Sequence, residues 1–236
     1  MGWTYDLLPL WHPVLLAEQV GTLAAIARGR FILQCAIGRD DEQFAAMGVA
    51  GRQRPSRFEE SLGILRRLWA GEEVTSDGRW QIRGARIAPL PPEPVEVWIG
   101  AMAEPAIDRA ARLGDGWLAS PHLTPDAAER QLELYVACCE THGRPRGTAA
   151  IRRDVYVGES AAEADATGGA VVRAGYRGLP PGATVVGDVD AVAKAFRELA
   201  VMGYSDVIVR SLVPDQVSAL ASIARLAEVR ALVADA

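Results

Sequence analysis

Short apolar runs alternate with longer amphipathic segments along this chain, and that pattern restricts the fold to a few classes. The continuous apolar runs Phe31–Ile37 and Val95–Gly100 have the length and composition of strands that are buried on both faces. Segments such as Pro55–Ala70 and Asp190–Met202 instead place their apolar residues at helical spacing. Strands that alternate with helices predict βαβ units and a mainly parallel sheet, which is an α/β fold.

The same reading predicts the order of the elements. We expect strands that begin near Gly2, Phe31, Val95, Trp117, Ile151 and Asp206. Helices are predicted at Val14–Ala27, Pro55–Ala70, Pro105–Leu113, Pro125–His142, Ala161–Ala174, Asp190–Met202 and Pro214–Val233. A β-hairpin that turns at Asp77 and Gly78 is expected after the second helix.

Several local signals refine this order. Gly168 and Gly169 predict a break in the helix that starts at Ala161. Thr124 is a predicted N-cap, and Asp188 or Asp190 is another. Gly38–Glu42 is expected to be a polar loop after the second strand. No repeat or linker divides the sequence, so we expect a single domain over residues 1–236.

Composition excludes some classes of function. The chain has 236 residues, half of them hydrophobic, which is enough for a substantial core. A net charge of -5 argues against nucleic-acid binding, and no apolar run approaches the roughly 20 residues of a membrane helix. The three cysteines, Cys35, Cys138 and Cys139, have no CxxC spacing. They predict a reducing, cytoplasmic location without a disulfide framework.

Four segments, taken in order, resemble the bacterial luciferase-like monooxygenase family of flavin- and F420-dependent oxidoreductases. They are Arg28–Leu33, Arg57–Trp69, Val95–Gly100 and Arg109–Trp117. The resemblance implies a TIM-type (β/α)8 barrel with FMN or coenzyme F420 at its mouth. In that family two further β/α units precede the segment that matches Tyr5–Pro13. We therefore expect an N-terminally incomplete barrel, because the protein is naturally short or because its start was assigned too late.

In such a barrel the active site lies at the C-terminal ends of the strands. That rule selects five loops: Leu8–His12, Gly38–Glu42, Gly100–Glu104, Ser120–His122 and Arg210–Leu212.

The cofactor-binding candidates are Gly100, Ala101, Met102, Ala103 and Glu104. They join a predicted strand to a helix, and the N–H groups of a helix N-terminus suit a phosphate. The resemblance implies that the family binds its cofactor phosphate here, although the family often has small hydroxyl residues where this chain has Met102 and Glu104. A second reading stays open, in which Glu104 simply pairs with the N-terminus of its own helix.

Two histidines are candidate catalytic residues, His12 after the first strand and His122 after the fourth. A packing role is the alternative for each of them. His142 is expected at a helix C-terminus. The carboxylates Asp40, Asp41 and Glu42 are read as a solvated loop or a helix start, because no His or Cys joins them at metal-ligand spacing.

Two functions remain. The first is a flavin- or deazaflavin-dependent oxidoreductase that acts on a small organic substrate. The alternative is a non-catalytic, shortened relative that binds flavin weakly or only folds and dimerises. A barrel without two of its units has open strand edges, so a homodimer is expected for either function.

Overall fold

The computed structural model describes residues 2–39, 41–180 and 182–234. The chain divides into two compact units. The first comprises Met1–Gly100 and Gly114–Gly116, and the second comprises Ala101–Leu113 and Trp117–Ala236. Each unit is described by itself.

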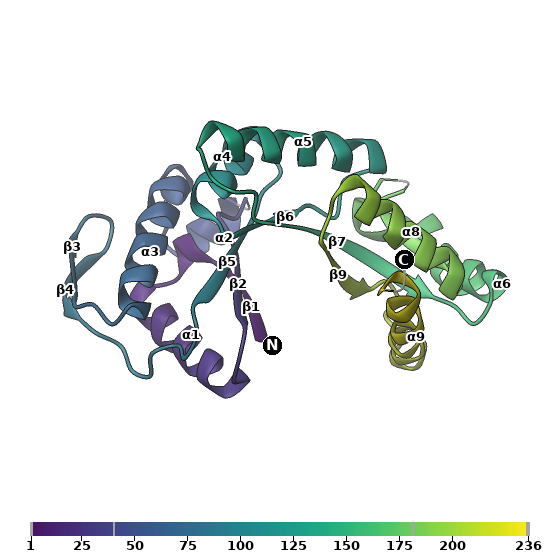
Figure 1. Cartoon of the computed structure of the whole chain (residues 1–236), viewed down its shortest axis with the longest axis horizontal. Helices are drawn as coiled ribbons and strands as arrows, with labels where there is room; N and C mark the ends of the chain where they lie inside the picture. Colours follow the sequence, from purple (N-terminus) through teal and green to yellow (C-terminus); the bar gives the residue numbers. More distant parts are fainter. Residues whose placement is uncertain (1, 40, 181, 235–236) are drawn as a thin grey trace. The chain divides into compact units, whose positions relative to one another are not determined.

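The first unit is built on three parallel strands, β1 (Gly2–Leu7), β2 (Phe31–Ala36) and β5 (Val95–Gly100). They lie in the order β1-β2-β5, with Gly2 opposite Phe31 and Phe31 opposite Val95. The helices α1 (Pro13–Ala27) and α3 (Arg54–Trp69) lie on one side of them (Figure 1). This arrangement confirms the expected parallel sheet.

The core of this unit follows from the period of two in its strands. Leu33 and Cys35 of β2 and Val97 and Ile99 of β5 share one face, and all four side chains are fully or almost fully buried. Burying a side chain of this size contributes about 1.5–3 kcal/mol, so this face contributes substantially to the stability of the unit.

The segment after β2 differs from the predicted loop. The helix α2 (Asp41–Ala46) begins inside the segment that was expected to be a polar loop. Asp41 and Glu42 occupy its first turn, where negative charge is favourable, and Phe44 is buried. Asp40 lies outside the described residues.

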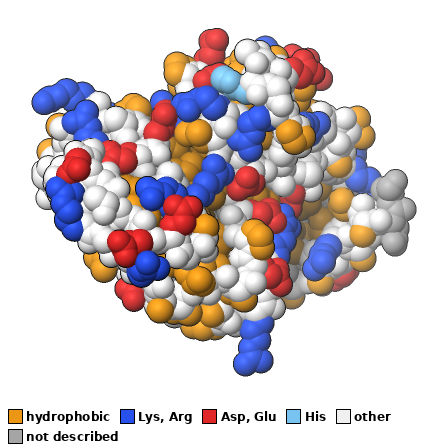
Figure 2. All heavy atoms as spheres, turned by 60° about the vertical axis from the view of Figure 1, so that its left-hand side comes forward, with side chains coloured by type: hydrophobic (Ala, Val, Ile, Leu, Met, Phe, Trp, Pro, Cys, Tyr) orange, Lys and Arg blue, Asp and Glu red, His pale blue; other side chains and the backbone are white. Residues whose placement is uncertain are grey.

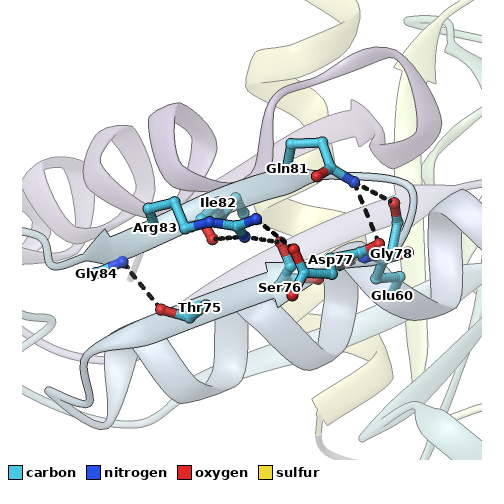
Figure 3. Close-up of polar contacts among 9 residues, drawn as sticks. All are labelled: Glu60, Thr75, Ser76, Asp77, Gly78, Gln81, Ile82, Arg83 and Gly84. Carbon is cyan, nitrogen blue, oxygen red and sulfur yellow. Dashed lines mark hydrogen bonds and ion pairs between the residues drawn. The ribbon is translucent and has the colours of Figure 1, made fainter.

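The predicted hairpin is formed by β3 (Val74–Asp77) and β4 (Gln81–Ala85), which pair antiparallel. Figure 3 shows how its turn is held against Glu60 of α3. The Glu60 carboxylate accepts hydrogen bonds from the Ser76 hydroxyl at 2.9 Å and from the Arg79 and Trp80 N–H groups at 2.7 and 3.2 Å. Gly78 permits this approach, because a Cβ there would lie 2.5 Å from a Glu60 oxygen.

Acidic and basic side chains are interspersed on the face of the molecule that Figure 2 shows.

Together with shorter helical segments that are described below, the second unit contains the following helices and strands. They are α4 (Glu104–Leu113), most of β6 (Gly116–Ala119), α5 (Pro125–Thr141), β7 (Thr148–Val157), β8 (Thr184–Gly187), α8 (Val189–Met202), β9 (Asp206–Ser211) and α9 (Gln216–Ala234). Both β8 and β9 pair parallel with β7. Val155 and Val157 of β7 pack with Val192 of α8 and Val229 of α9, which fixes those helices on one face of the strands.

Two predicted N-caps are confirmed. The Thr124 hydroxyl accepts the Ala127 N–H at 3.4 Å, and the Asp188 carboxylate accepts the Ala191 N–H at 3.0 Å. No helix in the described part of the chain has the length and apolarity needed to cross a membrane.

The segment after β7 differs from the prediction in two ways. The expected break at Gly168 and Gly169 is wrong: α6 (Ala161–Ala164) widens into a π-helical turn, η3 (Asp165–Gly169), and continues as α7 (Ala170–Arg173). Gly168 is needed in this turn, because a Cβ there would lie 2.8 Å from the Cβ of Tyr156. The short strand β8, which follows the 3-10 turn η4 (Tyr176–Gly178), was not predicted.

Candidate functional site

The predicted phosphate-binding segment is the connection between β5 and α4. Gly100 ends β5 and Glu104 begins α4, so Ala101, Met102 and Ala103 form the link. The Ala101 N–H donates to the Leu118 carbonyl at 3.2 Å, and the Trp117 indole donates to the Ala101 carbonyl at 3.0 Å. The Gln131 amide donates to the Met102 carbonyl at 3.0 Å. Residues of β6 and α5 therefore hold this link.

The backbone N–H groups that follow Ala101 are not held by such hydrogen bonds. The Ala103 carbonyl accepts the N–H groups of Ala106 and Ile107, which starts the helix. The N–H groups of Met102, Ala103 and Glu104 have no acceptor among the described residues, as is normal for the first residues of a helix. Three donors at the positive end of a ten-residue helix can bind an anion.

The competing group is the Glu104 carboxylate. Glu104 is the acidic residue of the first turn of α4. A phosphate bound at the same turn would be repelled by it, and that repulsion limits affinity without excluding binding. The geometry is therefore compatible with both readings of this segment.

His12 lies at the N-cap position of α1, directly before Pro13. Its ring packs edge-on against Trp80 of the hairpin, with 5.2 Å between ring centroids, and its Nδ1 is buried without a hydrogen-bond partner in the described part of the chain. The Trp80 ring also contacts a cation, since the Arg57 guanidinium lies 4.0 Å from its centroid. His12 thus has a packing contact in the first unit.

His122 belongs to the second unit and follows β6. Its N–H donates to the Ser120 hydroxyl at 3.3 Å, and its ring Nδ1 lies 3.3 Å from the same oxygen. His142 has the position that its sequence predicted, at the C-cap of α5, and its Nε2 lies 2.7 Å from a carboxylate oxygen of Asp108.

A polar cluster on β7 was missed by the sequence analysis. Asp154 is fully buried and accepts a hydrogen bond from the Tyr176 hydroxyl at 3.0 Å and from Arg152 Nε at 3.2 Å. Burial raises the pKa of Tyr176, and its hydrogen bond to Asp154 raises it further. The available signal was a pair of charged residues two positions apart in an apolar strand, which places both side chains on one face.

Metal-ligating residues do not gather in the part of the chain that is described. There, no group of three His, Cys, Asp or Glu side chains lies close enough to hold an ion.

Sequence comparison matches the chain to a known family. The family model for luciferase-like monooxygenases matches residues 2–201. The F420-dependent glucose-6-phosphate dehydrogenase of Beutenbergia cavernae is 35% identical over 112 residues, which is 46% of this chain and 33% of that protein. The aligned part of the chain therefore spans about a third of the length of that relative.

Solved structures show the same fold over more of the chain. The monooxygenase RslO1 from Streptomyces bottropensis superposes with a TM-score of 0.82 at 20% identity, over 96% of this chain and 76% of that one. The oxygenating constituent of 3,6-diketocamphane monooxygenase from Pseudomonas putida, solved with FMN, gives 0.78 at 19% identity, over 95% and 77%. The chain therefore has the α/β fold of these luciferase-like barrel proteins.

Proposed function

The chain belongs to the luciferase-like monooxygenase family, and on that basis we propose that it is an oxidoreductase that uses FMN or coenzyme F420. Its substrate is a small organic molecule. A relative named as F420-dependent and a structural neighbour solved with FMN support this choice of cofactors.

One observation carries the proposal. The link from β5 to α4 presents the N–H groups of Met102, Ala103 and Glu104 without protein acceptors among the described residues. Both FMN and F420 carry a phosphate group, and a helix N-terminus with available N–H groups suits a phosphate. The side-chain and backbone contacts of Ala101 and Met102 hold these donors in place before a ligand arrives.

The residues of the chain have distinct roles in this proposal. The α4 N–H groups bind and orient the phosphate, while Glu104 weakens that binding. The cofactor supplies the redox chemistry, which is transfer of a hydride to the substrate or activation of oxygen. His12 and His122 follow strand ends, where a barrel enzyme places its catalytic groups, and we propose them as proton donors.

The same premise leads to a homodimer, in a reducing compartment. Within the first unit, β1 is an edge strand. It pairs with β2 on one side, and no other strand of the described residues pairs with it. Leu15, Leu23 and Ile26 of α1 are 57%, 42% and 71% exposed, which is unusual for large apolar side chains on one helix. A second copy of the chain would cover such a surface. The reducing compartment is proposed from the cysteine spacing, because Cys35, Cys138 and Cys139 form no CxxC pair.

Cofactor titration followed by a turnover assay tests this function. We expect FMN or F420 to bind saturably to the purified chain, with a change in cofactor fluorescence. We then expect the reduced, bound cofactor to be reoxidised faster by oxygen or by a carbonyl substrate than the free cofactor. Binding without any acceleration across a panel of oxidants would contradict the catalytic part of the proposal.

A further inference from the structure

The cluster around Asp154 carries more positive charge than its carboxylate can balance. Asp154 is the register partner of Arg210 on β9 and of Thr184 on β8. Register partners in parallel strands point to the same face of a sheet, and Arg152 shares that face because it lies two residues before Asp154. This face is opposite to the one on which Val155 and Val157 pack against α8 and α9.

A third arginine, Arg177 of η4, follows Tyr176 in the chain, and the Tyr176 hydroxyl donates to Asp154. The positive charges of Arg210 and Arg177 act to lower the pKa of Tyr176, against burial and the hydrogen bond to Asp154. Arg177 has a left-handed backbone conformation, with φ of 51°, which is uncommon for a residue other than glycine.

Acceptors for these arginines are scarce. Arg152 is paired with Asp154, whereas Arg177 and Arg210 are exposed and have no ion pair among the residues that the structure describes. Two carboxylates of α6 and η3 have other partners, since Glu163 accepts from Tyr156 and Thr167, and Asp165 pairs with Arg173. The ion pair of Asp154 with Arg152 therefore leaves Arg177 and Arg210 without a carboxylate partner among the described residues.

A cavity of about 450 Å³ lies next to β8. Thr184, the register partner of Asp154, lines it together with Val186, Arg173 and Asp165, whereas Arg177 and Arg210 do not. The cluster lies toward the C-terminal ends of β7 and β9, which is the end of parallel strands where ligands of barrel proteins bind.

We propose that Arg210 and Arg177 bind an anionic group, a phosphate or a carboxylate, of a ligand that lies over β7 and β9. Asp154 is a positioning residue here, because it holds Arg152 and Tyr176 and leaves the other two arginines available. The inference depends on the proposed function only for the source of the anion, which is either the cofactor or the substrate.

Titration of the full chain with inorganic phosphate, followed by calorimetry or phosphorus NMR, tests the site itself. We expect saturable binding that is weakened about tenfold by Arg210→Gln, which corresponds to about 1.4 kcal/mol. Arg177→Gln should also weaken it. Arg230→Gln is the matched control, because Arg230 is an exposed residue of α9 outside the cluster. The affinity of this variant for phosphate should stay within about twofold of that of the wild type.

A competition experiment separates the two sources. If FMN displaces phosphate from the cluster, its single phosphate lies here and not at the N-terminus of α4, which would contradict the proposed cofactor site. If both bind together, the anion that the cluster takes belongs to the substrate. Phosphate binding that is lost in Arg210→Gln supports the site even when neither FMN nor F420 binds, so the two proposals can fail separately. No saturable phosphate binding, or equal affinity in the wild type, Arg210→Gln and Arg177→Gln, would overturn the inference.

Discussion

At the scale of single residues, the site depends on which charge occupies the N-terminus of α4. Met102, Ala103 and Glu104 offer N–H donors, and Glu104 brings a carboxylate to the same turn. The sequence identified this segment through the order of strand, glycine and helix. It could not decide between a bound phosphate and a self-paired helix end, because the helix dipole favours either anion equally.

The first prediction concerns this carboxylate. Glu104→Ser should tighten binding of FMN or F420 by roughly twofold to thirtyfold, because removal of a competing charge at a helix N-terminus contributes about 0.3–2 kcal/mol. Calorimetric titration of both proteins measures the change. Asp126→Ser is the matched control, since Asp126 lies in the first turn of α5, and it should leave the affinity unchanged. Weaker binding in Glu104→Ser would place the phosphate elsewhere.

The second prediction concerns Cys35. Burial raises the pKa of its thiol, and the nearby Asp6 carboxylate raises it further. In the unfolded chain a thiol ionises near pH ~8.5, so the folded protein should lose about 1.4 kcal/mol of stability per pH unit above that value. Below pH ~8 the contribution of the Cys35 thiol to the free energy of unfolding is constant.

Urea denaturation between pH 7 and 10 measures this effect in the wild type and in Cys35→Ala. The variant lacks the titrating group, so its stability should fall less steeply with rising pH. Parallel curves for the two proteins would show that the thiol ionises in the folded state.

At the scale of elements, the sequence predicted the long helices and the buried strands, but it did not predict the short strand β8. Phe31–Ala36 and Val95–Gly100 were found because a continuous apolar run has few alternatives to a buried strand. The strand Thr184–Gly187 was missed because four residues carry little periodicity, and its pairing with β7 is set by tertiary contacts. The Asp154 cluster was missed for a related reason, since its partners come from η4 and β9.

The hairpin provides the third prediction. Three donors converge on the Glu60 carboxylate, so Glu60→Ala should destabilise the first unit by about 2–4 kcal/mol and increase hydrogen exchange of the Arg79 and Trp80 amides. Urea denaturation and exchange by NMR are the measurements. Glu72→Ala is the control, because its ion pair with Arg67 is about half exposed and contributes less than about 1 kcal/mol. Equal effects of both variants would be inconsistent with this anchoring role.

At the scale of the whole molecule, the exposed apolar side chains of α1 predict self-association. We expect a homodimer at micromolar concentration by light scattering. Ile26→Lys should shift the equilibrium toward the monomer, because it introduces a charge into the apolar patch. Val201→Lys is the comparison, since Val201 is 88% exposed on α8 of the other unit and should leave the dimer intact. A wild-type protein that stays monomeric would refute the dimer proposal.

The central proposal is that the N-terminus of α4 holds the phosphate of a redox cofactor. Its most direct test is NMR titration of the ¹⁵N-labelled full chain with FMN and with F420. We expect saturable shifts of the Met102, Ala103 and Glu104 amide resonances with at least one of the two cofactors, because those N–H groups would gain a charged acceptor. Saturable cofactor binding that leaves these three resonances unmoved would contradict it.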